Sequence, residues 1–531
     1  MRFFSFLIIG IFFDVSTVLA DWVNPTGAEI APNIAEIRIS DDKVRVAFEI
    51  HVDEIDVFRG LVGGDGSDSP DIMPFRVLRD EQVLLAPKVR LVKQRIRKDR
   101  YSPYAGMINP LTGQPFLNPI ADKRVYYIEV DYQLDKKPTS LSFIPPMKAD
   151  GSVAANIGFI TFHNSVGVTD FKYLSAPATI NLDWDDPWYS RYENKILTRH
   201  HKDPLRIYLY VEPRRARLEF LMRIRDFVEW SGMEPLGTKS LTASQQQKLK
   251  ENVSKYFDKY KILSIDSKRV DPSAVTVNFI KLSRSTTTPL DGQEVIDIPS
   301  TYIGISQAFN YQEIPQNITV DWQFFSDRVV RIPVVITDPA GPFSDYVVKD
   351  SATIEWQNFL RVYVEPAFKP VLLKTGATLN VPLLGLIQIY NEPPTAEQAA
   401  DILSGIFANM QVAYLEKDAA NRRRGLANTS HTSKLDDLIY DLDKAFDIKV
   451  SSGGAASILD IEDLLVENVI ESTDDAGFSF IASWQAVAVA NHWGHTDRQR
   501  LQFRASIDIY EDEDDWKIKD FTLLDLKRID L

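Results

Sequence analysis

The chain contains no cysteine among its 531 residues. This absence excludes disulfide bonds, cysteine-ligated zinc, thiol catalysis and lipid attachment to a cysteine that follows a signal sequence. Secreted eukaryotic proteins commonly use disulfides, so an exported chain without cysteine fits the periplasm of a Gram-negative bacterium better.

Long hydrophobic runs are also lacking. Beyond residues 1–20, no segment reaches the roughly 18 uninterrupted apolar residues of a transmembrane helix. Residues 1–20 combine a positive charge at Arg2, an apolar run over 3–13 and a small residue at Ala20. This pattern is typical of a cleaved secretory signal peptide. We therefore expect a mature periplasmic protein that begins at or near Asp21 and has no transmembrane segment.

The common catalytic signatures are missing as well. The sequence has no glycine-rich phosphate loop, nucleophile elbow, zinc-protease helix or dinucleotide fingerprint. Its formal net charge of −14 argues against nucleic acid as a partner, because phosphate recognition requires clustered positive charge. We expect no cofactor and no metal, and the absence of motifs favours binding over catalysis.

An internal repeat is the most informative feature that is present. Segments 43–58 and 215–230 align without a gap, and their apolar residues alternate with polar ones in the same phase. The matched pairs are Val46 with Leu218, Phe48 with Phe220, Ile50 with Met222 and Val52 with Ile224. Period-two alternation predicts half-buried antiparallel strands. The two copies are therefore expected to share a fold.

The same offset relates Phe171 to Phe343 and Trp184 to Trp356, which extends the repeat. One-sided sheets bury each other's apolar faces, so we predict two β-sandwich domains, over 21–200 and 205–370. The second copy also carries a helix that begins after Thr242. Gln245 completes a capping box there.

A proline-rich connector over 371–395 precedes a different kind of sequence in 396–531. Thr395 and Gln398 form a second capping box, and a helix, a basic loop at 422–424 and a helix at 433–446 follow. Long alternating strands then run over 478–490, 499–510 and 515–528 as an antiparallel meander.

This order of helices before a long meander that ends in Trp516-Lys-Ile resembles the NTF2-like (SnoaL-like) cone fold. The resemblance implies an α+β domain whose sheet and helices enclose a pocket, and its family includes enzymes, ligand binders and association modules. The two repeats also resemble, loosely, uncharacterised bacterial periplasmic β domains. The predicted fold class is thus a β-rich, multidomain chain with two sandwiches and one cone.

The cone resemblance makes Trp484 a candidate pocket residue. His492-Trp493-Gly494-His495 lies where a strand ends, and a turn at Gly494 could bring the two histidines together. The cluster could form a hairpin end packed by Trp493, a pocket rim or a metal site. The pocket candidates are Trp484, His492, Trp493 and His495.

Residues 88–100 concentrate positive charge in an otherwise acidic chain. The basic residues are Lys88, Arg90, Lys93, Arg95, Arg97, Lys98 and Arg100. On a regular strand Lys88 and Arg90 share one face while Lys93, Arg95 and Arg97 share the other, so one face cannot hold them all without a bulge. The run is either a solvated edge protected against pairing or a contact for an anionic partner.

The meander is also expected to need cover on its outer face. We place Phe503, Ile507 and Ile509 on one face and Leu501 and Ala505 on the other. A second copy, or the proline-rich segment 365–394, would then cover the apolar outer face. The predicted function is an exported binding or assembly protein without catalysis, with a protein partner or self-association. The alternative is a ligand-binding or hydrolytic pocket in the C-terminal domain.

Overall fold

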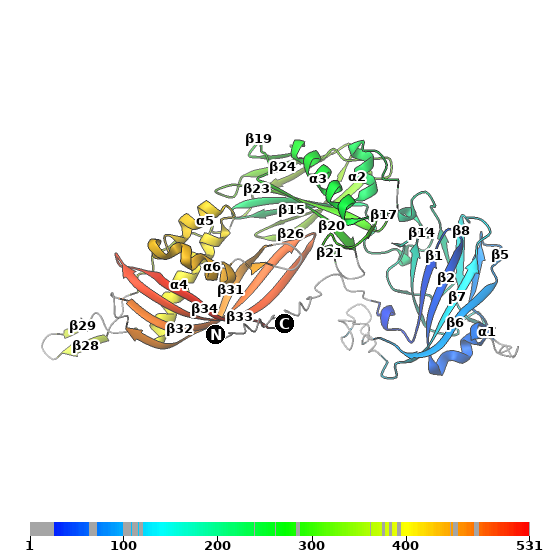
Figure 1. Ribbon diagram of the computed structural model, residues 1–531, viewed down its shortest axis with the longest axis horizontal. Coiled ribbons are helices and arrows are strands. Elements are labelled where there is room, and N and C mark those ends of the chain that lie inside the picture. Colours follow the sequence, from blue (N-terminus) through cyan, green and yellow to red (C-terminus); the bar gives the residue numbers. More distant parts are fainter. Residues whose placement is uncertain are drawn as a thin grey trace, which may run out of the picture.

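The computed structural model describes residues 26–62, 72–98, 108, 115, 120–237, 239–260, 262–282, 287–361, 363–373, 377–381, 385–389, 394–446, 448–449, 455–471 and 477–529. The predicted signal peptide lies outside these residues. Figure 1 shows a β-rich molecule in three parts: a first region (26–200), a second region (205–361) and a C-terminal region (394–529). None of the helices in the described part is long and apolar enough to cross a membrane.

Two facing sheets form the first region. Their strand orders are β11-β10-β1-β2-β7-β6, with β12 on β10, and β14-β13-β8-β4-β5. The strands are β1 (Asn33–Ile39), β2 (Lys43–His51), β3 (Ile72–Met73), β4 (Arg76–Arg79), β5 (Val83–Leu84), β6 (Pro87–Ile96), β7 (Arg124–Gln133), β8 (Ser140–Ile144), β9 (Met147–Lys148), β10 (Ile157–His163), β11 (Val166–Gly167), β12 (Lys172–Tyr173), β13 (Ala178–Asn181) and β14 (Arg191–Tyr192). Its helices are η1 (Ala28–Ile30), η2 (Val52–Phe58), α1 (Arg59–Val62), η3 (Pro187–Tyr189) and η4 (Lys195–Leu197).

The core of the first region lies between these sheets. Phe48 of β2 and Ile128 of β7 pack in one buried cluster with Val77, Leu141 and Ile180 of the other sheet. This arrangement follows from the alternation, because one face of each strand is apolar. One pairing differs from the antiparallel expectation, since β1 and β10 are parallel.

The second region repeats this topology. Its sheets have the orders β21-β20-β23-β16-β15-β25-β26 and β19-β18-β24-β27. The strands are β15 (Leu205–Glu212), β16 (Arg215–Arg223), β17 (Ser240–Leu241), β18 (Leu263–Ile265), β19 (Lys268–Arg269), β20 (Ala274–Leu282), β21 (Thr287–Pro289), β22 (Ile296–Asp297), β23 (Thr301–Asn310), β24 (Asn317–Asp321), β25 (Arg331–Asp338), β26 (Gly341–Val348) and β27 (Thr353–Gln357). The helices are α2 (Ile224–Ser231) and α3 (Ala243–Lys259).

The registers of the two regions also correspond. β1, β2, β7, β6 and β10 match β15, β16, β23, β20 and β25, and both regions pair the first of these strands in parallel with the last. Equivalent aspartates make the same hydrogen bonds in the two regions. The Asp80 carboxylate accepts from the N–H groups of Thr139 and Ser140. The Asp266 carboxylate accepts from those of Gln316 and Asn317.

The prediction that Phe171 matches Phe343 and Trp184 matches Trp356 is wrong. Phe171 is buried, whereas Phe343 is 44% exposed on β26. The cross-strand registers equate Trp356 with Ile180 and not with Trp184, because Ile318 pairs with Trp356 where Leu141 pairs with Ile180. Loops of unequal length between the strands shift the spacing while the strand order persists.

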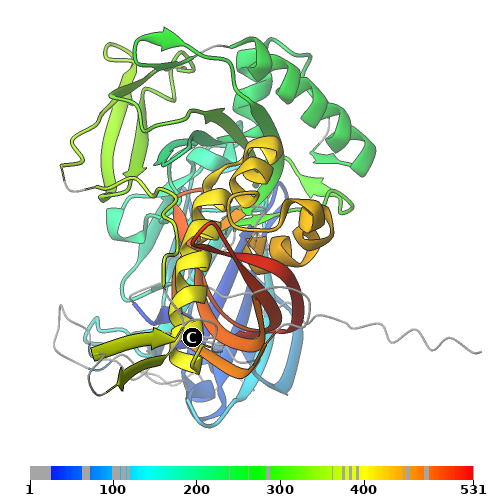
Figure 2. The same ribbon diagram turned by 90° about the vertical axis from the view of Figure 1, so that its left-hand side faces the viewer.

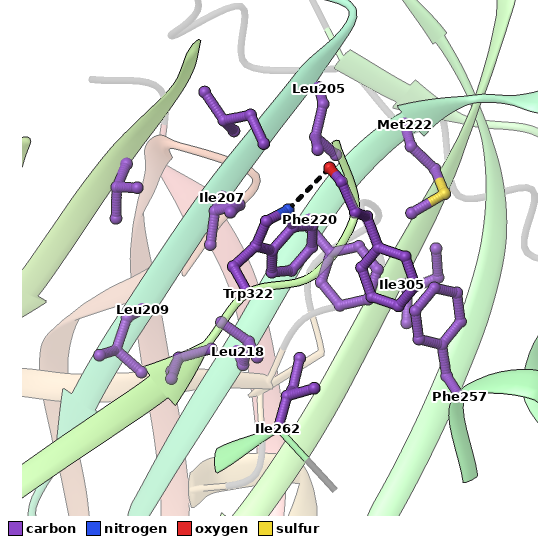
Figure 3. Packing of buried hydrophobic residues seen from close by; sticks show 14 of the residues in the cluster. Leu205, Ile207, Leu209, Leu218, Phe220, Met222, Phe257, Ile262, Ile305 and Trp322 are labelled. Atoms are coloured by element: carbon purple, nitrogen blue, oxygen red, sulfur yellow. Dashed lines mark hydrogen bonds between the residues drawn. The ribbon is translucent and has the colours of Figure 1, made fainter. Parts of the chain in front are cut away.

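Helix α3 covers one side of the second region's core. The capping box of Thr242 and Gln245 is present, as the sequence predicts. Phe257 packs edge-on against Phe220 at 4.9 Å between ring centroids, and Phe220 in turn contacts Trp322 at 5.2 Å (Figure 3). The Trp322 Nε1–H donates to the Phe324 carbonyl over 3.1 Å, so the buried indole nitrogen is satisfied.

The C-terminal region consists of helices on a strongly curved sheet, which Figure 2 shows beside α4. The helices are α4 (Ala396–Leu415), α5 (Ala419–Leu426), η5 (Thr432–Lys434) and α6 (Leu435–Phe446). The strands, in the order β30-β31-β32-β33-β34, are β30 (Ile448–Lys449), β31 (Ala455–Glu471), β32 (Gly477–His492), β33 (His495–Asp512) and β34 (Asp515–Ile529). A separate hairpin, β28 (Ala377–Val381) with β29 (Gly385–Ile389), precedes them.

Two predictions for this region are wrong. Residues 422–424 are not a loop but part of α5, whose first turn is capped by Asp418 accepting from the Asn421 N–H. The apolar residues of β33 do not divide between two faces. All five share the inner face because they are spaced by two, and all are buried: Leu501, Phe503, Ala505, Ile507 and Ile509.

The outer face of β33 is accordingly polar, with Gln502, Arg504, Ser506, Asp508 and Tyr510. The described residues of the proline-rich segment make their contacts elsewhere. The segment crosses α4, where Val371 packs against Gly405, and reaches the β33–β34 turn, where the Trp516 N–H donates to the Val371 carbonyl over 3.2 Å.

Candidate binding surface

Trp484, the first pocket candidate, lies in the packed interior of the C-terminal region. Its ring stacks on Phe503 at 5.2 Å between centroids and contacts Phe407 of α4 at 4.8 Å. It is 1% exposed, and Ala486 and Ala488 beside it are fully buried. Side chains therefore fill the space between the helices and the sheet at this point.

The second candidate, the His492–His495 sequence, forms a two-residue hairpin between β32 and β33. His492 pairs with His495, while Trp493 (φ 47°) and Gly494 (φ 85°) have the left-handed conformations of a tight hairpin turn. The side chain of His495 lies outside the described part. Within that part, no group of three or more histidine, aspartate or glutamate side chains is arranged to hold a metal ion.

Trp493 packs against the second region. Its ring belongs to a buried cluster with Tyr208, Tyr210 and Tyr302 on the outer face of that region's sheet. A Cβ atom at Gly304 would lie 2.8 Å from the Trp493 ring, so only glycine leaves the required space. The hairpin therefore joins two parts of the molecule.

Polar contacts fix the hairpin at this site. The Trp493 N–H donates to a carboxylate oxygen of Glu219 over 2.8 Å, and the Gly494 N–H donates to the Tyr210 hydroxyl over 2.9 Å. Arg217 donates to the Asn491 carbonyl over 2.5 Å. A buried backbone group without such a partner would cost free energy, so these bonds define one docked geometry.

The first and second regions are joined by a buried ion pair. Arg223 of β16 donates through Nη1 to both carboxylate oxygens of Asp186 at 3.0 Å and through Nε to Asp226 at 2.8 Å. Both carboxylates and the guanidinium are largely excluded from water. Removal of one partner would leave a buried charge unpaired, which makes the junction specific.

The basic run occupies β6, which is the edge strand of the first region's larger sheet. A β-bulge lies between Val89 and Leu91. Because of it, Lys88 stands opposite Asp131, Lys93 opposite Tyr127 and Arg95 opposite Val125. Alternate residues of β7 share a face, so all three basic residues lie on the same side of the sheet. A regular strand would place Lys88 on the opposite face from Lys93 and Arg95, and the bulge brings all three to one face.

That side is the outer face, because Ile128 and Val130 of β7 point into the core. Acidic residues stand among the basic ones there. Arg45 donates to Asp131 over 2.7 Å, and this hydrogen bond lowers the pKa of the Asp131 carboxyl. Arg95 forms an ion pair with Glu49 at 2.6 Å and lies 3.8 Å from the centroid of the Tyr127 ring.

The remaining basic residues fall into two groups. Arg90 lies 3.5 Å from Asp131, and Arg97 lies 3.3 Å from Glu49 and donates to the Ala31 carbonyl over 2.7 Å. Lys88, Lys93 and Lys98 are exposed. Their ammonium groups form no ion pair with another described residue. Arg100 lies outside the described residues.

Sequence reasoning identified the basic run and the need for a bulge, but not the acidic residues beneath it. Glu49 and Asp131 lie on other strands, and only the register places them there. It also missed a cleft of about 740 Å³ between segment 364–373 and α4, which Asp401, Asn409 and Phe446 help to line. Its lining comes from elements far apart in the sequence.

No family model matches the chain, and no curated protein matches it. Among solved structures, the chain is similar to the crystal structure of the intermembrane space region of the chloroplast protein ARC6. That comparison covers 25% of this chain and 98% of the other at 15% identity, with a TM-score of 0.18. A similarity of this size carries no argument about fold or function.

Proposed function

We propose that the chain is an exported binding or assembly protein of the periplasm, which acts without catalysis and binds an acidic protein segment at the first region. The binding surface consists of β6 and the outer face beside it, with Lys88, Lys93 and Lys98 as the charges that select the partner. The observation that carries the proposal is the bulge of β6, which gathers basic side chains on one face. The corresponding strand β20 pairs with β23 without a bulge.

The chemistry of the packed interior of the C-terminal region supports a role without catalysis. General acid–base catalysis requires a titratable group within reach of a bound substrate. The buried polar residues described in this region are Asn409, Thr429, Ser430 and His492, and none is a carboxylate. His492 lies at the hairpin that docks on the second region, away from the interior around Trp484.

The C-terminal region is further proposed to be an NTF2-like domain that serves association. Helices α4 and α6 pack on one face of a long antiparallel meander, as the resemblance implies. Its hairpin at Trp493 already makes an intramolecular contact of this kind.

The proposed compartment rests on residues 1–20 and on the lack of cysteine. N-terminal sequencing of the protein from a Gram-negative host should give a mature chain that begins at or near Asp21. Recovery of the full-length protein with Met1 from the cytoplasmic fraction would contradict the proposed export.

Charge reversal tests the binding surface directly. A fluorescein-labelled peptide of about eight residues, with alternating valine and glutamate, serves as the probe. The double variant Lys88→Glu/Lys93→Glu should weaken peptide binding at least tenfold in fluorescence anisotropy, since like charges replace attractive ones. The control Lys268→Glu/Lys349→Glu changes the net charge equally at exposed positions of the second region and should bind normally.

Two outcomes would overturn this proposal. Equal loss of affinity in both double variants would mean that only the net charge matters. Binding of anionic lipid vesicles, with no affinity for the acidic peptide, would identify a membrane surface instead of a protein segment as the partner.

The cleft beside α4 favours a second candidate function, the binding of a small apolar molecule. Its volume of about 740 Å³ lies in the range of ligand pockets. Ala408 is exposed along it, so Ala408→Trp should fill the cleft. Retention of a co-purifying ligand by the wild type and its loss in this variant, measured by native mass spectrometry, would support the function; an identical ligand content would exclude it.

A further inference from the structure

Among the described strands, none pairs with the outer edge of β6, and this edge presents backbone groups as well as charge. The Arg97 N–H donates to the Lys123 carbonyl over 2.8 Å, so the backbone of Arg97 points toward β7. Backbone groups alternate in direction along an antiparallel strand. Val92, Gln94 and Ile96 therefore direct their N–H and carbonyl groups away from the sheet.

In the second region, the edge of β20, the counterpart of β6, pairs with a further strand. β21 pairs antiparallel with β20 at Ile280, Lys281 and Leu282. The Leu290 N–H donates to the outward carbonyl of Phe279 over 2.9 Å. Phe279 pairs with Ile303 where Gln94 pairs with Tyr126, so Phe279 and Gln94 hold equivalent positions. The fold thus adds a strand at this edge in one region.

We propose, on the basis of the proposed function, that the acidic partner segment binds by adding a strand to the outer edge of β6. Its backbone pairs with the outward groups of Val92, Gln94 and Ile96. Its acidic side chains lie on the outer face near Lys93 and Lys88. Its apolar side chains lie on the opposite face beside Val92 and Ile96, which are 38% and 65% exposed.

The positive charge of β6 favours an acidic segment over a second copy of the chain as the added strand. Pairing of β6 with β6 of another copy would place lysine and arginine side chains against their own kind across the new interface. The bulge and the lysines thus oppose self-pairing, as edge strands commonly do. The same charges favour an acidic segment, because each acidic residue then meets an opposite charge.

Backbone methylation of the probe tests the pairing itself. Methylation of alternate nitrogens removes the donors along one edge of the peptide, and methylation of the other set removes those along the opposite edge. One set should lower the affinity at least tenfold while the other has little effect, because only one edge faces β6. Equal affinity of both methylated peptides and the parent would overturn strand addition.

A protein variant provides the matching test. Gln94→Pro removes an outward N–H but leaves the ladder to β7 intact, since edge strands accept proline at such positions. It should weaken peptide binding at least fivefold, whereas Gln94→Ala should not, and thermal unfolding should show that both variants fold. Normal binding by the folded Gln94→Pro variant would overturn strand addition.

The two proposals fail separately. If the lysine reversal abolishes binding while methylation and Gln94→Pro do not, the acidic partner contacts side chains alone, and the proposed function stands without strand addition. If the lysine reversal has no effect, the proposed function itself fails.

Discussion

The first and second regions share a strand order, yet the outer faces of their larger sheets differ in chemistry at several positions. Equivalent positions hold charged residues in the first region and apolar or aromatic residues in the second. The pairs are Glu36 with Tyr208, Arg38 with Tyr210, Glu49 with Leu221 and Arg95 with Ile280. A shared strand order therefore does not determine what the outer face of a sheet contacts.

The difference follows from what covers each face. In the second region Trp493 packs on the face, and Gly304 provides its space. In the first region Tyr127 stands at that position and supports Arg95 and Lys93, whose charges lie 3.8 and 5.6 Å from the ring centroid. One face is an internal interface, and the other is the proposed binding surface.

The edge strands differ in the same way. β20 is covered by β21 along part of its edge, and Phe279 is buried near α3, with the Lys250 ammonium 5.6 Å from its ring. Every residue of β6 except Arg95 is exposed. The strand β21, which follows β20 in the chain, thus covers this edge in the second region, whereas no described strand pairs with the outer edge of β6.

Removal of the hairpin anchor should have the largest effect. Trp493→Ala should lower the free energy of unfolding by about 3–5 kcal/mol, the usual cost of truncating a buried tryptophan. Chemical denaturation measures the change, and hydrogen exchange should show faster exchange on β16 and β23. A loss below about 1 kcal/mol would mean that the face does not depend on this contact.

A tyrosine at position 304, as at the equivalent Tyr127 of the first region, tests why the two sheet faces differ. Gly304→Tyr places the counterpart of Tyr127 against Trp493, where even a Cβ atom would approach the ring to 2.8 Å. It should expel the hairpin and destabilise the protein about as much as Trp493→Ala does. In the double variant the two effects should not add, because both remove the same contact.

The pH dependence of stability should also distinguish the regions. Burial lowers the pKa of His163 to about 4, and its equivalent in the second region is Asp338. Below pH 6.5 the unfolded chain binds the proton first, so His163 stabilises the fold above that pH. The contribution is lost as the pH falls from about 6.5 to 4, at a cost of up to about 3 kcal/mol.

The variant His163→Asn removes this titration and should have a shallower loss of stability over the same pH range. Urea unfolding at several pH values measures it, and the imidazole resonances report the pKa of His163 directly. An ordinary histidine pKa near 6.5 would contradict the buried, neutral state.

The smallest effect on stability is expected at β6. Lys88→Glu/Lys93→Glu should change the free energy of unfolding by no more than about 0.5 kcal/mol, because both side chains are exposed. The same change should weaken peptide binding at least tenfold. A larger destabilisation would indicate that the lysines serve the fold and not a partner.

Much of this architecture follows from alternation and capping in the sequence. The strands around Phe48 and Phe220, the capping boxes at Thr242 and Thr395, and the meander after residue 477 lie where the pattern predicts. These features are local, since strand period and caps depend on neighbouring residues. The topology of sheets requires pairings between distant segments, which a single sequence does not reveal.

Pairings and contacts between distant segments account for two of the failures, at Phe343 and Trp493, whereas the error at α5 is local. Phe343 matches Phe171 in spacing, but the register assigns it to a different position on β26. The helix α5 was hidden by three consecutive arginines, which suggest a solvated loop although arginine is a good helix former. Trp493 has no local signal for docking, because its binding site is formed by Gly304, Tyr208 and Tyr210 of another region.

Hydrogen exchange of the intact chain, with and without the acidic peptide, tests the central claim most directly. The account predicts that the peptide slows exchange at Val92, Gln94 and Ile96 of β6, whose N–H groups face outward, and leaves β20 over 274–282 unchanged. Protection of β20 instead of β6, or the same protection in Lys88→Glu/Lys93→Glu as in the wild type, would contradict it.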